Sequence, residues 1–113
     1  MIKKIWLSFL YSCHGIKATF VKEYSFRLEV ILLFIVVAFL ILINVSSYRK
    51  IIMLASYFFI PCVELLNSAI EKLADRLTTK HDLTIQFVKD AASAAVMVSI
   101  IIVALIWIAC IWF

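Results

Sequence analysis

Three long apolar runs, separated by short polar stretches, dominate this chain. The first run is interrupted only by Glu29 at one edge and Asn44 near the other, and the second turns polar after Leu66. A helix needs about 20 residues to cross a bilayer, so we expect the second helix to continue beyond the membrane surface. The pattern predicts membrane-spanning helices over residues 28–46, 51–77 and 91–113, with a polar loop over 78–88.

The N-terminal 26 residues have a different periodicity, with apolar and polar side chains on opposite faces of a helix. Ile5 and Phe9 belong to the apolar face, and Lys3 and Lys17 to the polar face. This pattern is typical of a helix that lies in the membrane interface with its lysines among the lipid headgroups. A soluble amphipathic helix is the alternative, but the rest of the chain supplies no soluble core for it.

Composition agrees with a membrane-embedded chain. Of the 113 residues 66% are hydrophobic, with one Gly and one Pro, whereas a soluble domain is nearer half apolar. We therefore expect a single-domain, all-α membrane protein over residues 1–113, built of an N-terminal amphipathic surface helix (1–26) and three transmembrane helices. The three cysteines lack CxxC spacing, so we expect small buried side chains rather than a metal site or disulfide.

Basic residues predict the orientation of the chain. Five precede the first span and four lie between the second and third, whereas the first turn carries only Arg49 and Lys50. By the positive-inside rule, the N-terminus and the second turn face the cytoplasm. Because these residues flank apolar segments, the net charge of +4 does not indicate a nucleic-acid partner. All seven acids then lie on the cytoplasmic side: Glu23, Glu29, Glu64, Glu71, Asp75, Asp82 and Asp90.

The second helix carries the candidate chemistry. Glu64, Asn67, Glu71 and Asp75 follow one another at steps of three and four, so they share one face of the helix. An acid near hydrocarbon is costly and is a functional-site hypothesis by default. A solvated helix end is the alternative, but Glu64 directly follows the apolar stretch IIMLASYFFIPCV. Pro61 lacks a backbone donor and predicts a kink just ahead of Glu64.

These residues suit phosphoryl transfer to a lipid. Glu23 and Glu71, with Asp75 as a further candidate, could hold a hard divalent cation such as Mg²⁺, which prefers oxygen ligands. Lys89 and Asp90 could add a phosphate contact and another oxygen, and charge neutralisation of this kind is what phosphoryl transfer requires. A single glycine excludes a P-loop, so any nucleotide site must be built from side chains on helices. Glu64 would take a proton from a lipid hydroxyl as general base.

Two blocks of this sequence resemble the prokaryotic diacylglycerol kinase family. One consists of ELLNSAIEKLADR from Glu64 and KDAASAAV from Lys89; the other consists of GIKA from Gly15 and KEYSFRLE from Lys22. The resemblance covers nearly the whole chain. It implies a homotrimer with active sites shared between subunits, transfer of the γ-phosphate of ATP to a lipid hydroxyl, and a place in the bacterial cytoplasmic (inner) membrane with the site on the cytoplasmic face.

The resemblance also implies roles for individual residues. Glu64 would be the catalytic base, and Glu23 and Glu71 the metal ligands. Residues implied to bind ATP and its metal are Lys4, Tyr11, Glu23, Asn67, Glu71, Lys80, His81, Asp82, Lys89 and Asp90. Residues implied to bind the lipid are Ser12, Arg27, Glu29, Glu64, Ser93 and Trp107.

This chain departs from the family pattern at two places. Lys4 stands where relatives can carry arginine, so it keeps the charge but loses the bidentate fork. Lys80, His81 and Asp82 replace an acid–aromatic–histidine run of one branch.

Apart from the resemblance, Trp107 and Trp112 at the far end of the third span are candidates for anchors at the membrane interface.

More than one function stays open at this point. One branch of the family phosphorylates diacylglycerol to phosphatidic acid and another phosphorylates undecaprenol; the SAAV stretch from Ser93 and the KEYSFRLE block favour diacylglycerol. A non-catalytic membrane interaction protein, with polar groups joining helices, is the alternative of another class. An ion transporter fits less well, because no acid reaches the middle of the first or third span.

Overall fold

Within residues 1–78 and 80–113, which the computed structural model describes, the chain forms five helices and no strand. Three segments are long and apolar enough to cross a membrane: Tyr24–Leu42, Ser47–Leu77 and Leu83–Trp112. The helices are α1 (Ile2–Lys22), α2 (Tyr24–Leu42), α3 (Ser47–Tyr57), α4 (Phe59–Leu77) and α5 (Leu83–Trp112). The all-α class and three candidate membrane spans are therefore confirmed.

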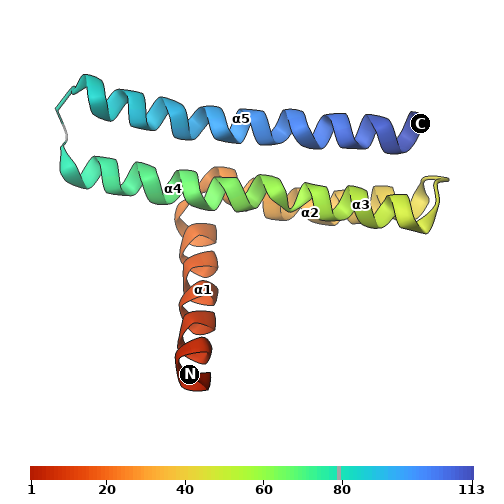
Figure 1. Ribbon diagram of the computed structural model, residues 1–113, viewed down its shortest axis with the longest axis horizontal. Coiled ribbons are helices and arrows are strands. Elements are labelled where there is room, and N and C mark those ends of the chain that lie inside the picture. The colour runs from red at the N-terminus through yellow and green to blue at the C-terminus, as the bar shows by residue number, and fades with distance from the viewer. Residues whose placement is uncertain (79) are drawn as a thin grey trace.

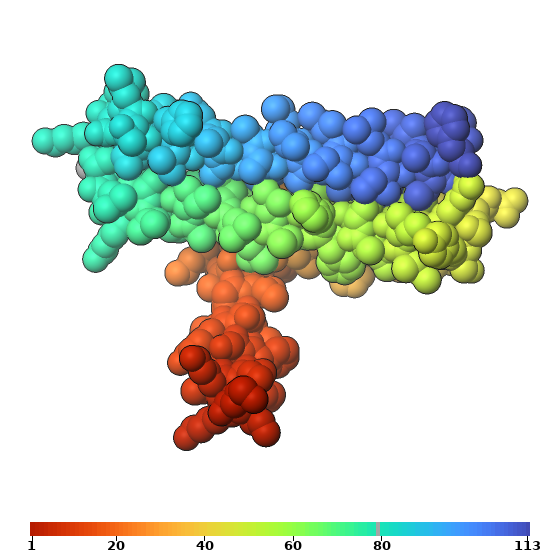
Figure 2. All heavy atoms as spheres, viewed as in Figure 1, coloured from red at the N-terminus to blue at the C-terminus, as the bar shows by residue number. Residues whose placement is uncertain are grey.

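The three candidate spans run alongside one another, and α1 projects crosswise from their side (Figure 1). Figure 2 shows α5 packed along α4 over most of its length, while α1 stands apart from the bundle for most of its own. A single extended residue, Glu23, separates α1 from α2. The guanidinium of Arg27 donates to the Phe20 and Val21 carbonyls, both at 3.0 Å, and so caps the end of α1. The place of α1 at a membrane surface stays a prediction.

The second span is interrupted where its proline requires it. α3 ends at Tyr57 and α4 begins at Phe59. Pro61 has no N–H to donate to the Tyr57 carbonyl four residues earlier, so the regular helical bond is lost there. The helix is therefore broken at Phe58, ahead of Glu64, but its two halves follow one another along the same rod (Figure 1), so the predicted kink stays a prediction.

All three candidate spans begin earlier than the apolar pattern predicts, α2 at Tyr24 instead of residue 28, and the other two begin at a side-chain cap. Ser46 caps α3 by accepting from the Arg49 N–H at 3.3 Å, so Arg49 and Lys50 lie in a helical turn. Asp82 caps α5 by accepting from the Thr84 and Ile85 N–H groups at 2.9 and 3.1 Å. The prediction of a polar loop over 78–88 is therefore wrong for its second half, because a cap can begin a helix before the apolar run starts.

Polar contacts join the helices at the end where α2 turns into α3. The Trp107 indole N–H donates to the Met53 carbonyl at 3.0 Å and to Ser56 Oγ at 3.1 Å, and the ring stacks on Phe39 at 5.9 Å. The Arg49 guanidinium donates to the Cys110 and Phe113 carbonyls, both at 2.9 Å. Trp107 therefore ties α5 to α3 and α2.

Little of the apolar surface is buried within one chain. Phe34 is 73% exposed and Leu105 is 62% exposed, as expected of helices whose outer faces contact lipid or another protein. The buried apolar side chains are Phe26, Leu40, Met53, Tyr57, Ala74, Ala92 and Val103. The prediction of buried cysteines is wrong for the single chain, because Cys13 and Cys62 are exposed and Cys110 is half-buried.

Replacement of Trp107 tests its role as an interhelical link. We expect Trp107→Phe to lower the free energy of unfolding by about 1 kcal/mol, because Phe can keep the ring contact with Phe39 but cannot donate a hydrogen bond to α3. Unfolding in detergent, followed by circular dichroism, measures the change. Trp112→Phe is the matched control, since Trp112 is 72% exposed. Equal effects of the two substitutions would contradict the assignment.

Candidate functional site

Glu23, Glu64, Asn67, Glu71 and Ser93 line one cavity of about 480 Å³, which we call the acid cavity. Glu64, Asn67 and Glu71 come from successive turns of α4, Glu23 from the corner between α1 and α2, and Ser93 from α5. The structure therefore brings together five residues that the sequence implicated. The apolar residues of the lining all come from α5 and are Val96, Met97, Ile100 and Ile101.

The two most buried polar side chains of the acid cavity are Glu64 and Asn67, and one of their atoms has no hydrogen-bond partner among the described residues. Glu64 is 7% exposed and Asn67 is 8% exposed. The Asn67 Oδ1 atom is buried without a hydrogen-bond partner among the residues described, and no ion pair formed by those residues reaches Glu64. Buried polar groups in proteins are nearly always satisfied, so such exceptions mark places where a ligand or an ion can bind.

One basic side chain reaches the edge of the acid cavity. Lys72 Nζ lies 3.4 Å from Glu23 Oε1, and the Lys72 side chain is 66% exposed. A neighbouring cavity of about 340 Å³, lined by Thr19, Lys22 and Ser68 among others, lies on this side of Glu23. An exposed ion pair of this kind contributes at most about 1 kcal/mol. The Glu23 carboxylate therefore remains open to a competing cation.

The acid cavity supplies part of a metal site. In the part of the chain that the structure describes, no three His, Cys, Asp or Glu side chains come close enough together to hold a metal by themselves. Mg²⁺ is usually bound by one or two carboxylates and completes its shell with water and phosphate oxygens. Glu23 and Glu71, with the unpartnered Asn67 oxygen beside them, fit that kind of partial set.

A second polar cavity, of about 290 Å³, lies at the turn between α4 and α5. Lys80, His81, Asp82 and Lys89 line it together with Asp75. It begins one turn beyond Glu71 on α4, which is about 6 Å along the axis. The cationic side chain of this cavity nearest α4 is Lys89, which forms an ion pair with Asp75.

Asp90 lies beside this cavity, on α5. Its Oδ1 atom accepts a hydrogen bond from Gln86 Nε2 at 2.8 Å. The implicated ATP-binding residues of α4 and α5 therefore form two neighbouring groups, one in the acid cavity and one at the α4–α5 turn.

The other implicated residues lie apart from the acid cavity within one chain. Tyr11 is 70% exposed on α1, and Lys4 on the same helix is also exposed. The Ser12 hydroxyl donates to the Ser8 carbonyl of that helix. Arg27 is engaged with the end of α1, and Trp107 with α3. Their predicted contacts with ATP or lipid stay predictions.

Glu29 belongs to a different, mostly apolar cavity of about 290 Å³ between α1, α2 and α4. Its Oε1 atom is buried and has no hydrogen-bond partner among the described residues. The Tyr57 hydroxyl donates to the Glu29 backbone carbonyl, which leaves the carboxylate itself unengaged. Glu29 thus lines this cavity and not the acid cavity.

Sequence reasoning missed two residues at the site. Lys72, which contacts Glu23, follows Ser68 by four residues and could have been found as a cation next to the acidic face. Ser25 lines the acid cavity, but nothing in the pattern around it indicates that role, because the corner at Glu23 decides where it lies.

Comparison with known proteins finds one family over most of the chain. The family model described as prokaryotic diacylglycerol kinase matches residues 10–111. A protein named diacylglycerol kinase from Escherichia coli is 30% identical over 102 residues, which cover 90% of this chain and 84% of that protein. Its namesake from Haemophilus influenzae is 35% identical, covering 86% and 82%, and that from Pseudomonas aeruginosa is 33% identical, covering 94% and 86%.

Proposed function

Because this chain belongs to the prokaryotic diacylglycerol kinase family, we propose that it transfers the γ-phosphate of ATP to the hydroxyl of diacylglycerol, giving phosphatidic acid and ADP. Membership of the family makes it a membrane-embedded lipid kinase. The observation that carries the finer proposal is the buried carboxylate of Glu64, which has no ion-pair partner among the described residues and lines a cavity with two further acids.

The acid cavity has the two-sided chemistry that a lipid acceptor needs. Its polar wall holds Glu64 and Asn67, and its apolar wall is made of α5 side chains such as Val96 and Ile100. A lipid could lay its chains against the apolar wall and present its hydroxyl to the polar one. Ligand sites commonly combine apolar walls with a few convergent polar groups in this way.

Glu64 acts as general base in the proposed reaction. The lipid hydroxyl oxygen attacks the γ-phosphorus as its proton passes to the Glu64 carboxylate. The bond between the γ-phosphorus and the oxygen bridging to the β-phosphate breaks, and that oxygen leaves with ADP. Since the attacking and leaving oxygens must be held in line, most of the catalysis is positioning and charge neutralisation.

Glu23 and Glu71 are the proposed ligands of Mg²⁺. When bound, the ion would neutralise charge on the transferring phosphates. Asn67 and Lys89 would hold phosphate oxygens, with Asp90 beside them. The α4–α5 turn, through Lys80, His81 and Asp82, would contact the rest of the nucleotide, which fits its position one helical turn beyond Glu71.

A homotrimer with shared sites would explain why some implicated residues lie away from the acid cavity. Lys4, Tyr11 and Ser12 on α1 would then reach the site of a neighbouring subunit, and Trp107 and Arg27 would shape the lipid-facing surface around it. The exposed apolar faces of α2 and α5 are available for such contacts. The positive-inside rule supports a cytoplasmic N-terminus and site in the inner membrane.

Glu64→Gln tests the proposed base directly. The substitution preserves shape but cannot accept the proton, so we expect phosphate transfer to fall by at least about 100-fold. Labelled ATP in mixed micelles, with diacylglycerol and undecaprenol offered separately, measures the transfer and identifies the acceptor. Unchanged mass of the assembly by native mass spectrometry would show that folding is intact.

Each outcome of this assay has a meaning. Label in phosphatidic acid supports the proposal, whereas label mainly in undecaprenyl phosphate keeps the mechanism and replaces the acceptor. Equal activity of Glu64→Gln would remove Glu64 as the base. No transfer to either lipid by the folded wild-type chain would leave the non-catalytic interaction protein as the better hypothesis.

Two adjacent substitutions on α4 should change metal binding in opposite directions. Glu71→Gln removes a ligand and should weaken Mn²⁺ binding by at least about tenfold. Lys72→Gln removes the cation beside Glu23 and should strengthen it by about fivefold at most, because the exposed pair contributes at most about 1 kcal/mol. Mn²⁺ serves here as a paramagnetic substitute for Mg²⁺. Electron paramagnetic resonance measures the free Mn²⁺ and so gives both affinities without an activity assay.

Lys22→Gln is the matched control for Lys72→Gln. It removes the same charge from the same cavity, but Lys22 is in no ion pair within residues 1–78 and 80–113. Its Mn²⁺ affinity should change less than that of Lys72→Gln. If both substitutions at residues 71 and 72 leave the affinity unchanged, Glu23 and Glu71 are not the metal ligands.

A further inference from the structure

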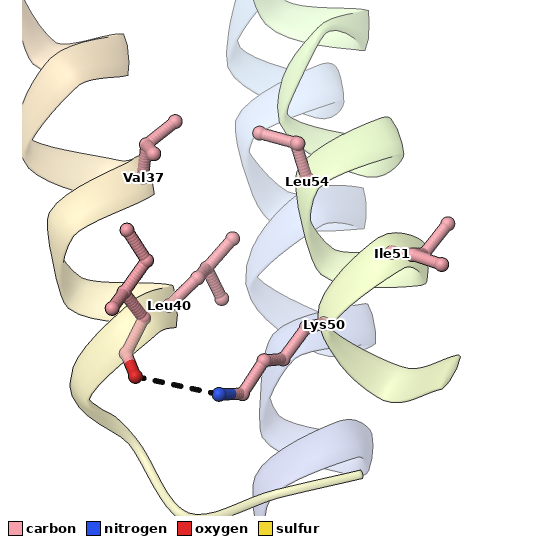
Figure 3. Close-up of a pocket in the computed structure, with 6 residues that line it drawn as sticks. Val37, Leu40, Lys50, Ile51 and Leu54 are labelled. Atoms are coloured by element: carbon pink, nitrogen blue, oxygen red, sulfur yellow. Dashed lines mark hydrogen bonds between the residues drawn. The ribbon is translucent and has the colours of Figure 1, made fainter. Parts of the chain in front are cut away.

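A groove between the end of α2 and the start of α3 lies far from the acid cavity. It encloses about 340 Å³, and we call it the α2–α3 groove (Figure 3). Fourteen residues of the α3–α4 rod separate Lys50 in the groove from Glu64, or about 21 Å at the helical rise. The groove is lined by Val37, Leu40, Ile41, Lys50, Ile51 and Leu54.

Lys50 is the single charged residue of this lining, and its charge has no acidic partner among the described residues. Figure 3 shows its side chain reaching from α3 across the mouth of the groove towards α2. Its Nζ atom lies 3.5 Å from the Ile41 carbonyl oxygen, which is longer than a good hydrogen bond. Residues 30–63 contain no Asp or Glu, and no ion pair of the described residues includes Lys50.

The neighbouring basic residue is used differently. Arg49 donates two hydrogen bonds to carbonyls at the end of α5, so its guanidinium is engaged within the chain. An ammonium has three donors, and the single long contact of Lys50 leaves two of them for a ligand. A positive charge with free donors at the mouth of an apolar groove is complementary to an anion that carries an apolar tail.

The groove is polar at its mouth and apolar deeper in, and a phospholipid likewise has a polar headgroup followed by apolar acyl chains. Its mouth lies beside the turn between Leu42 and Ser47, where the polar residues Asn44 and Ser46 indicate headgroup depth. Val37 and Leu54 lie one turn deeper than Ile41 and Lys50, about 6 Å towards the middle of the spans. A headgroup at Lys50 would thus place its acyl chain against the aliphatic side chains.

We propose that the α2–α3 groove binds an anionic phospholipid, with a phosphate oxygen on Lys50 and an acyl chain along Val37, Leu40 and Leu54. A zwitterionic lipid carries its own cation beside the phosphate, so it gains less from the lysine. One lysine near an anionic headgroup is worth about 1 kcal/mol, or about fivefold in affinity. The groove shares no residue with the acid cavity, so the proposal is independent of the kinase reaction.

Native mass spectrometry of the full chain tests this charge preference. The protein is released from nanodiscs of phosphatidylglycerol and phosphatidylcholine, and each bound lipid is identified and titrated. Lys50→Gln keeps a donor for the Ile41 carbonyl but loses the charge, so we expect phosphatidylglycerol binding to fall by about fivefold. Lys50→Arg should retain it, and phosphatidylcholine binding should change in neither variant. Equal thermal unfolding of both in phosphatidylcholine excludes a folding defect.

A second pair of variants tests the groove itself. Leu54 is half-buried and lines the groove. The larger side chain of Leu54→Trp should fill the groove and remove the tightly bound phosphatidylglycerol. Ile35→Trp is the control, because Ile35 is 61% exposed and stands two residues before Val37, on the other side of α2. Equal phosphatidylglycerol binding by wild type, Lys50→Gln and Leu54→Trp would overturn the proposal. A change of oligomer mass in Leu54→Trp, with no lipid bound to the wild type, would show that a second copy occupies the groove.

Discussion

A bilayer offers no water to polar groups, so every polar group within a spanning helix must find a partner in the protein or be left unsatisfied at a cost of several kcal/mol. This chain meets the constraint differently at its two ends. Near the α2–α3 turn, Trp107 and Arg49 donate to backbone carbonyls of other helices. In the acid cavity, Glu64 has no ion-pair partner and an oxygen of Asn67 has no hydrogen-bond partner among the residues described. The contrast separates the end that holds the helices together from the end that can do chemistry.

The corner between α1 and α2 is what turns an acidic helix face into a site. A single extended residue links the two helices, and that residue is Glu23. Because Arg27 caps the end of α1, the corner is held from both sides, and Glu23 is placed against α4 beside Glu64 and Glu71. Three carboxylates from two separate parts of the sequence thus line one cavity without a loop of their own, which a chain with one glycine could not easily provide.

The site of a single chain is visibly unfinished. The acid cavity has polar and apolar walls, but α1 points most of its length away from it (Figure 1), and the outer faces of α2 and α5 are apolar and exposed. Three helices bury too little surface to enclose a lipid and a nucleotide together. In the proposed homotrimer a neighbouring subunit would close the acid cavity, and in the proposed lipid site a phospholipid would fill the α2–α3 groove.

Sequence by itself determined the helical class, the three spans and the shared face of Glu64, Asn67 and Glu71, because each depends on local periodicity or on the length of an apolar run. It also implicated Glu23, through the preference of hard cations for carboxylates and through the family resemblance rather than through spacing. Caps decided where α3 and α5 begin, so the loop predicted over 78–88 proved too long. Only tertiary structure decided that Trp107 donates to α3, that Lys72 contacts Glu23, and that Ser25 lines the acid cavity. The first two contacts join residues that are distant along the chain, and the place of Ser25 depends on the backbone path at the corner between α1 and α2. A periodic pattern within one helix does not specify which other helix that helix will pack against.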